Sequence, residues 1–206
     1  MTEAADPDAP VNPYAAPSAN LDTPPATAPA HASAAFYPMS PAKLVTMSVL
    51  TFGVYDLAFW WRQWSARRRT GEQLSVFWRT VFAGFTGFGF NNSLSVALTL
   101  RDRPLPASLP LAPGVYLASL VVGRVIDRMS LTAALALSLT LLVGLIRASA
   151  LGVIQSAVNE LLELEHYRGP FNRGLTAGSL IVGLLGILLW GVAVFGALFP
   201  SELSAS

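Results

Sequence analysis

The chain has 206 residues, of which 53% are hydrophobic and only 12% are Asp, Glu, Lys or Arg. Soluble domains carry about 25% charged residues, so this chain has too few charges to cover a water-facing surface. The composition excludes a soluble globular enzyme, and the high hydrophobicity equally excludes a wholly disordered chain. The length allows a bundle of four or five membrane spans of about 20 residues each.

The net charge of +1 conceals an uneven distribution along the chain. Residues 1–42 contain acidic residues but no Lys or Arg, whereas the remainder carries all 13 basic residues. These basic residues are spread over short loops, which indicates membrane orientation rather than binding of nucleic acid. The absence of cysteine excludes disulfides, thiolate metal sites and Fe–S clusters.

Residues 1–42 form a separate compositional zone that is dominated by Ala and Pro. Proline removes a backbone donor and fixes φ, and alanine offers little apolar surface to bury. This composition predicts a disordered, acidic tail, although a docking peptide at Asn12-Pro13-Tyr14 is an alternative. We expect a transmembrane helical domain over residues 43–199 and a short C-terminal tail over residues 200–206.

The first predicted span runs from Lys43 to Trp61, after a helix start at Ser40-Pro41. We predict that aromatic and basic residues at its end anchor the chain at the membrane interface, because indole rings favour the headgroup level. These residues are Trp60, Trp61, Arg62 and Trp64. Asp56 lies within this span and is a candidate functional carboxylate. So close to the interface it can instead hydrate or pair with Arg62, and we favour this interpretation.

The segment from Arg62 to Arg79 holds five arginines and one acidic residue, Glu72. The positive-inside rule places this loop in the cytoplasm and the N-terminus outside. We also predict that anionic lipid headgroups bind at Arg67, Arg68 and Arg69. Arg79 is a candidate functional residue at the end of this segment.

The second predicted span covers residues 77–98 and contains three glycines among phenylalanines. Their spacing does not match a phosphate-binding loop, so we predict that neighbouring helices approach closely at Gly84, Gly87 and Gly89. Asn91 and Asn92 are candidate functional polar residues that hydrogen-bond across helices or mark a local break. Four prolines between residues 101 and 113 define a loop before a short third span over residues 109–124.

A fourth span is predicted over residues 131–146, and its helical pattern continues past Arg147 into an amphipathic segment. Asn159 lies on the polar side of that segment and is a candidate functional residue. The fifth predicted span covers residues 175–199. Small residues recur in and just before it at short spacing and predict a ridge for close helix packing. They are Gly174, Gly178, Ser179, Gly183 and Gly186.

The sequence predicts no catalytic centre, no cofactor and no metal site. Glu163-x-x-His166 matches part of a di-iron carboxylate motif, but that site needs a second such pair. The only other histidine is His31 in the predicted tail, so the chain cannot complete the site alone. A Ser-His-Asp triad is equally hard to assemble from one histidine in the folded part.

Several sequence strings resemble an uncharacterised family of bacterial multi-pass membrane proteins. They include Phe36-Tyr37-Pro38-Met39-Ser40-Pro41, Thr51-Phe52-Gly53-x-Tyr55-Asp56-Leu57 and Ser75-x-Phe77-Trp78-Arg79. The tail string Asn12-Pro13-Tyr14-Ala15-Ala16-Pro17 is similar to leaders of assorted bacterial membrane proteins. The resemblance implies a location in the bacterial inner membrane, and it implies no activity.

These observations predict an all-α transmembrane helix bundle of five spans, or four if the third fails. We expect a structural, accessory or interaction role, with the lipid bilayer and either a second copy or another membrane protein as partners, and no nucleic acid. The alternative function is a small transporter or channel subunit. Its pore polar groups would be Asp56, Arg79, Asn91 and Asn92.

Overall fold

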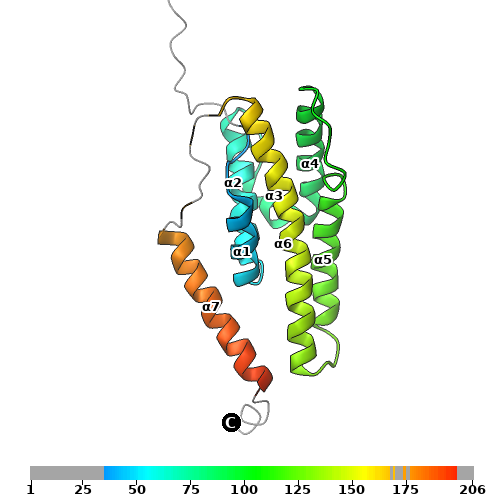
Figure 1. Cartoon of the computed structure of the whole chain (residues 1–206), viewed down its shortest axis with the longest axis vertical. Coiled ribbons are helices and arrows are strands. Elements are labelled where there is room, and N and C mark those ends of the chain that lie inside the picture. Colours follow the sequence, from blue (N-terminus) through cyan, green and yellow to red (C-terminus); the bar gives the residue numbers. More distant parts are fainter. Residues whose placement is uncertain (1–34, 168, 170–173, 175–176, 199–206) are drawn as a thin grey trace, which may run out of the picture.

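The computed structural model describes residues 35–167, 169, 174 and 177–198. The regular secondary structure of this part of the chain consists of helices only, which confirms the predicted all-α class (Figure 1). Its helices are α1 (Pro41–Leu50), α2 (Val54–Arg69), α3 (Val76–Val81), α4 (Ala83–Thr99), α5 (Ala112–Ile126), α6 (Ala133–Leu164) and α7 (Ala177–Leu198). The long helix α6 runs along the bundle, with α5 packed beside it and α7 slanting past its other side.

The helices α1 and α2 form a hairpin, so the prediction of one continuous first span over residues 43–61 is wrong. The chain turns back because Phe52 and Gly53 have φ values of 50° and 88°, a region that glycine adopts without steric cost. The Gly53 amide donates to the Ser48 carbonyl at 2.8 Å and closes the end of α1. Farther along α2, the Gln63 side chain bonds to the backbone of Tyr37, which precedes α1. The later part of α2 therefore lies beside the residues that precede α1.

The hairpin also brings the chain just before α1 close to the Arg62–Arg79 segment. The prediction placed the N-terminus and the Arg62–Arg79 loop on opposite sides of the membrane, which requires one crossing between them. In the structure, the Arg67 guanidinium lies 6.0 Å from the ring centre of Phe36. The residues just before α1 and the end of α2 therefore lie at the same end of the hairpin.

The chain is packed from Phe36 onward, earlier than the predicted tail boundary at residue 42. Phe36 and Met39 are buried in the core, and Ser40 caps the start of α1 as predicted, accepting a bond from the Lys43 amide. Residues 1–34 and 199–206 lie outside the described residues, and with them most of the predicted tails.

The second predicted span, residues 77–98, is broken at Phe82 into the short helix α3 and the 17-residue helix α4. Close helix approach is confirmed at two of its three glycines. A Cβ on Gly84 would lie 2.9 Å from Leu117, and one on Gly87 would lie 3.2 Å from Trp60. No atom lies within 4 Å of the Cβ position of Gly89.

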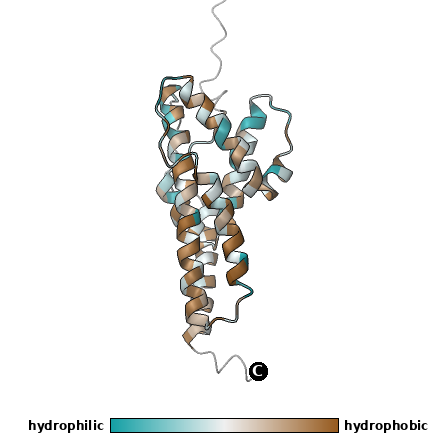
Figure 2. Cartoon of the chain, turned by 90° about the vertical axis from the view of Figure 1, so that its right-hand side faces the viewer, coloured by the Kyte–Doolittle hydropathy of each residue, from teal (hydrophilic) through white to brown (hydrophobic). Residues whose placement is uncertain are grey.

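Two of the described helices, α6 and α7, are long and apolar enough to cross a membrane. They correspond to the fourth and fifth predicted spans, and α6 continues past Arg147 as predicted, for 32 residues in all. The third predicted span becomes α5, which has only 15 residues. The five predicted spans are therefore not confirmed. Hydrophobic residues dominate the lower part of the molecule, whereas hydrophilic residues gather toward the other end (Figure 2).

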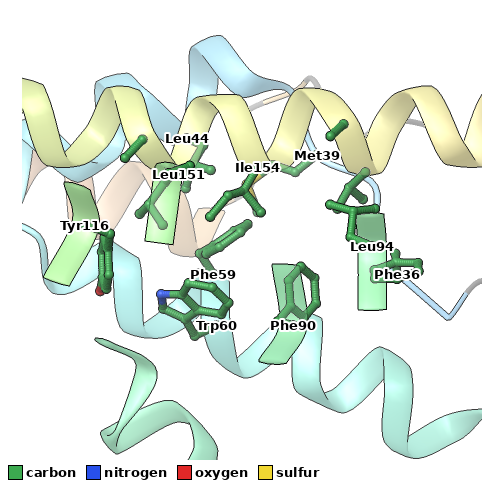
Figure 3. Packing of buried hydrophobic residues seen from close by; sticks show 14 of the residues in the cluster. Phe36, Met39, Leu44, Phe59, Trp60, Phe90, Leu94, Tyr116, Leu151 and Ile154 are labelled. Atoms are coloured by element: carbon green, nitrogen blue, oxygen red, sulfur yellow. The ribbon is translucent and has the colours of Figure 1, made fainter. Parts of the chain in front are cut away.

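The core lies where α1, α2, α4 and α5 come together with α6 (Figure 3). Trp60 and Trp64 of α2 are fully buried, and the ring of Phe90 packs edge-on against both of them. Leu151 and Ile154 of α6 cover the other side of this aromatic cluster. This packing fixes α2 against α6 and thereby sets the position of the hairpin tip.

Candidate functional site

A buried ion pair lies beside the tip of the α1–α2 hairpin. Asp56 stands in the first turn of α2, and its Oδ2 lies 3.0 Å from Nε of Arg147 on α6. The two side chains are only 3% and 14% exposed. The predicted partner, Arg62, instead donates to the Tyr55 hydroxyl at 3.3 Å. Sequence reasoning missed the role of Arg147 because no local pattern connects two residues so far apart in the chain.

Gly53 makes room for this ion pair. A Cβ on Gly53 would overlap the guanidinium of Arg147, so the arginine head lies directly against the glycine backbone. The positive φ of Gly53 independently disfavours any side chain there. Both the hairpin turn and the packing of the Arg147 guanidinium therefore depend on Gly53.

A cavity of about 380 Å³ adjoins Arg147 between the hairpin tip, α5, α6 and α7. Its polar wall consists of Ser119, Arg124, Asp127, Thr140 and Arg147. Arg124 and Asp127, three residues apart at the end of α5, form a largely exposed ion pair of 3.7 Å. The cavity thus extends from exposed charges at the end of α5 to the buried arginine.

The helix α7 closes the cavity on one side and holds the hairpin tip. The Trp190 indole donates to the Val49 carbonyl at 3.2 Å, and its ring stacks on Phe52 at 4.3 Å. A Cβ on Gly186 would overlap the carbonyl oxygen of Leu50. The Val49 carbonyl also accepts from the Phe52 amide at 3.2 Å, so the Trp190 indole is its second donor at the end of α1.

The predicted ridge of small residues on α7 is confirmed at two positions. Gly183 lies against Met47, and Gly186 lies against the backbone of α1. A Cβ on Gly174 or Gly178 would meet no atom of another segment within 4 Å, whereas Ser179, beside Gly178, is buried at 3% exposure.

Lys43 connects the start of α1 to the segment before α7. Its side chain is buried, and its Nζ donates to the Gly174 carbonyl at 2.5 Å. Burial and, secondarily, the nearby Arg62 charge lower the pKa of Lys43 from its ordinary value. The basic group thus serves as a link between two parts of the fold.

Three amide side chains clamp the residues that precede α1. Gln63 accepts from the Tyr37 amide at 2.9 Å and donates to Gln155 at 2.8 Å. Gln155 donates in turn to Asn159 at 2.8 Å, and Asn159 donates to the Met39 carbonyl at 2.8 Å. The predicted site residue Asn159 therefore holds the chain in place. Buried amides that are fully bonded in this way favour one packing of the core.

The predicted pore residues do not come together around one cavity. Asn91 is buried and donates to the Leu109 carbonyl at 3.1 Å, whereas Asn92 is exposed. Arg79 lies over the ring of Trp64 at 4.8 Å. None of these three residues lines the cavity beside Arg147, and Asp56 alone of the predicted set lies near it.

The predicted interface anchors divide into two groups. Trp60 and Trp64 are fully buried inside the protein, so their assignment to the lipid interface is wrong. Trp61 is 48% exposed and faces outward, and Arg62 is half-buried beside Tyr55. The string of aromatic and basic residues thus contributes more to the core than to the surface.

The three arginines predicted to bind lipid headgroups also differ. Arg67 forms an ion pair of 2.7 Å with Glu72, and its guanidinium lies 5.6 Å from the ring centre of Trp64. Arg68 and Arg69 are exposed and line an open groove on the outer face of α2. Aromatic walls of this groove come from Trp61 and Phe77.

Among the described residues, no group of three or more His, Asp or Glu side chains has a metal-binding arrangement. Glu163 and His166 stand at the end of α6 without further ligands of this kind around them. Comparison with protein-family models, curated proteins and solved structures finds no match. The fold itself therefore defines the class: a helical protein with two helices long and apolar enough to cross a membrane.

Proposed function

We propose that this is a multi-pass protein of the bacterial inner membrane with a structural, accessory or interaction role rather than a catalytic one. This proposal rests on the bonds that the buried polar side chains make within the protein itself. Gln63, Gln155 and Asn159 bond to the chain before α1, and Asp56 pairs with Arg147. These groups hold the hairpin in place. The bacterial location rests on the sequence resemblance.

In this proposal, α6 and α7 cross the membrane, and α5 pairs with α6 as a shorter third segment. At 1.5 Å per residue, α6 is about 48 Å long, so it crosses a core of about 30 Å and projects beyond it. The α1–α2 hairpin enters from the arginine-rich end and returns to it. Irregular backbone at membrane depth is tolerated where protein surrounds it, and α7 covers the tip at Phe52.

The arginine-rich end is proposed to face the cytoplasm. Basic residues of the described chain gather at this end, near the Arg62–Arg79 segment and the end of α6, where Arg101 and Arg103 pair with Glu165 and Glu160. The opposite end, between α5 and α6, carries only Arg124 and Arg128. The positive-inside rule therefore favours this orientation, and the hairpin brings residues 36–40 to the cytoplasmic side as well.

Single cysteines test this topology directly, because the natural chain has none. In intact cells, an impermeant maleimide is expected to label Ser130→Cys, and to label Thr70→Cys and Ala35→Cys only after permeabilisation. Labelling of Thr70→Cys from outside would reverse the orientation. Labelling of Thr70→Cys and Ala35→Cys from opposite sides would contradict the hairpin.

Anionic lipid headgroups are proposed to bind along the groove at Arg68 and Arg69. Arg67 contributes less to this binding, since its guanidinium is engaged by Glu72. At about 1 kcal/mol per basic residue, Arg68→Gln/Arg69→Gln is expected to weaken retention of phosphatidylglycerol by roughly thirtyfold. Native mass spectrometry of the purified protein measures this, with Arg103→Gln as the control. Equal retention by both variants would contradict the proposal.

A small transporter or channel subunit is the second candidate, and the cavity next to Arg147 is the observation that favours it. The accessory role predicts that proteoliposomes pass ions and small solutes no faster than protein-free liposomes. If the wild-type protein passes solutes faster than protein-free liposomes and Asp56→Asn does not, the result would support transport and contradict the accessory role. Size-exclusion chromatography of Asp56→Asn checks that the variant remains folded.

A further inference from the structure

The cavity beside the hairpin tip has a polar end and apolar walls. Arg147 stands at one end, and aromatic and aliphatic side chains cover the sides. The apolar lining includes Val49, Phe52, Leu120, Leu141, Val143 and Trp190. Its volume of about 380 Å³ lies within the range of about 300–1,000 Å³ that is typical of small-molecule sites.

The charges on the cavity wall favour an anion. Arg124 and Arg147 line the cavity together with one acidic residue, Asp127, which leaves the wall with a net positive charge. Asp56 pairs with Nε of Arg147 from behind and does not line the cavity. The terminal nitrogens of Arg147 make no hydrogen bond to any described residue. The guanidinium therefore retains donors for a second, planar acceptor.

We propose that this cavity binds a small amphiphilic carboxylate, with its carboxylate on Arg147 and its apolar body between α5, α6 and the Phe52–Trp190 pair. A guanidinium fork matches the two oxygens of a carboxylate, and apolar walls select a ligand with a hydrocarbon body over an inorganic anion. This inference goes beyond the proposed accessory role and does not depend on it.

The test uses the full chain in detergent with 4-bromobenzoate as the probe. Bromine quenches nearby indoles, and Trp190 lines the cavity, so binding appears as saturable quenching of tryptophan fluorescence. We expect saturation with 4-bromobenzoate and only weak, linear quenching with the neutral 4-bromobenzamide. The Trp190→Phe variant is expected to lose the saturable component.

Two substitutions connect this binding to the cavity. Gly144 lines the cavity with open space at its Cβ position, so Gly144→Leu fills the site without a clash at Cβ. We expect it to weaken binding at least about tenfold while the melting temperature is maintained. Arg147→Lys, which keeps the charge but loses the fork, is expected to weaken binding by about tenfold. Gly114→Leu, which has similar open space outside the cavity, is the control.

Three results would overturn the inference. Saturable quenching of equal strength by the amide would show that charge plays no part. Unchanged binding in Gly144→Leu would place the ligand elsewhere. Absence of saturable quenching by 4-bromobenzoate in folded wild-type protein would show that the cavity does not bind carboxylates of this class.

Discussion

Replacing Arg147 with methionine is expected to destabilise the protein by about 3–5 kcal/mol. The substitution leaves the Asp56 carboxylate buried without a cation, because the side chain of Asp56 is only 3% exposed. Such an uncompensated charge costs far more than the ion pair itself contributes. Unfolding by SDS in mixed micelles, followed by circular dichroism, measures the loss.

The double variant Asp56→Asn/Arg147→Met separates the charge effect from the loss of packing. It removes both charges, so we expect it to recover most of the stability that Arg147→Met loses. If the double variant is as unstable as the single one, the packing of the arginine stem, and not its charge, holds the hairpin tip.

Replacing Gly186 with leucine is expected to displace α7 and to cost about 2–4 kcal/mol. The added Cβ would overlap the carbonyl oxygen of Leu50, so the helix must move away from α1. The cost combines overpacking with loss of the Trp190 bond to Val49. Unfolding measurements give the free energy, and quenching by chain-brominated lipids in nanodiscs reports whether Trp190 has become accessible to lipid.

Gly191→Leu is the matched control on the same helix. A Cβ on Gly191 meets no atom within 4 Å, so its effect on stability is expected to stay within about 0.5 kcal/mol. Similar losses in Gly186→Leu and Gly191→Leu would mean that α7 does not dock on α1 through Gly186.

Part of this fold follows from residue patterns that are local in the chain. The apolar lengths of α6 and α7 are sufficient to predict both helices, and the small residues Gly183 and Gly186 predict the face of α7 that contacts α1. The helix start at Ser40 is likewise a local signal, because a serine before Pro41 caps the first turn. These features depend only on neighbouring residues.

The hairpin escaped prediction because its signal is a single glycine within an apolar run. Gly53 is compatible with a continuous helix at a cost of about 1 kcal/mol, so the pattern alone does not reveal a turn. The reversal is fixed by distant contacts, from Arg147 of α6 and Trp190 of α7, which lie far along the chain. The same distance concealed the true partner of Asp56.

The aromatic string at the end of the hairpin has two physical interpretations that sequence alone does not separate. Tryptophans beside arginines are typical of a membrane interface, which explains why Trp60 and Trp64 were predicted to face lipid. Guanidinium groups also stack on buried rings, as Arg67 and Arg79 do on Trp64. Which surface an indole faces is decided by neighbouring helices, here by Phe90 of α4.

The stacking of Trp190 on Phe52 has a consequence for the order in which the protein is assembled. The hairpin tip leaves the ribosome about 140 residues before the indole that covers it. At about 5–20 residues per second, this interval is roughly 7–28 s. During that time, the Val49 carbonyl and the Phe52 ring lack their final cover. The α1–α2 hairpin is therefore completed only when α7, the last described helix, has been made, and truncation before Trp190 leaves a nascent chain with an unfinished hairpin.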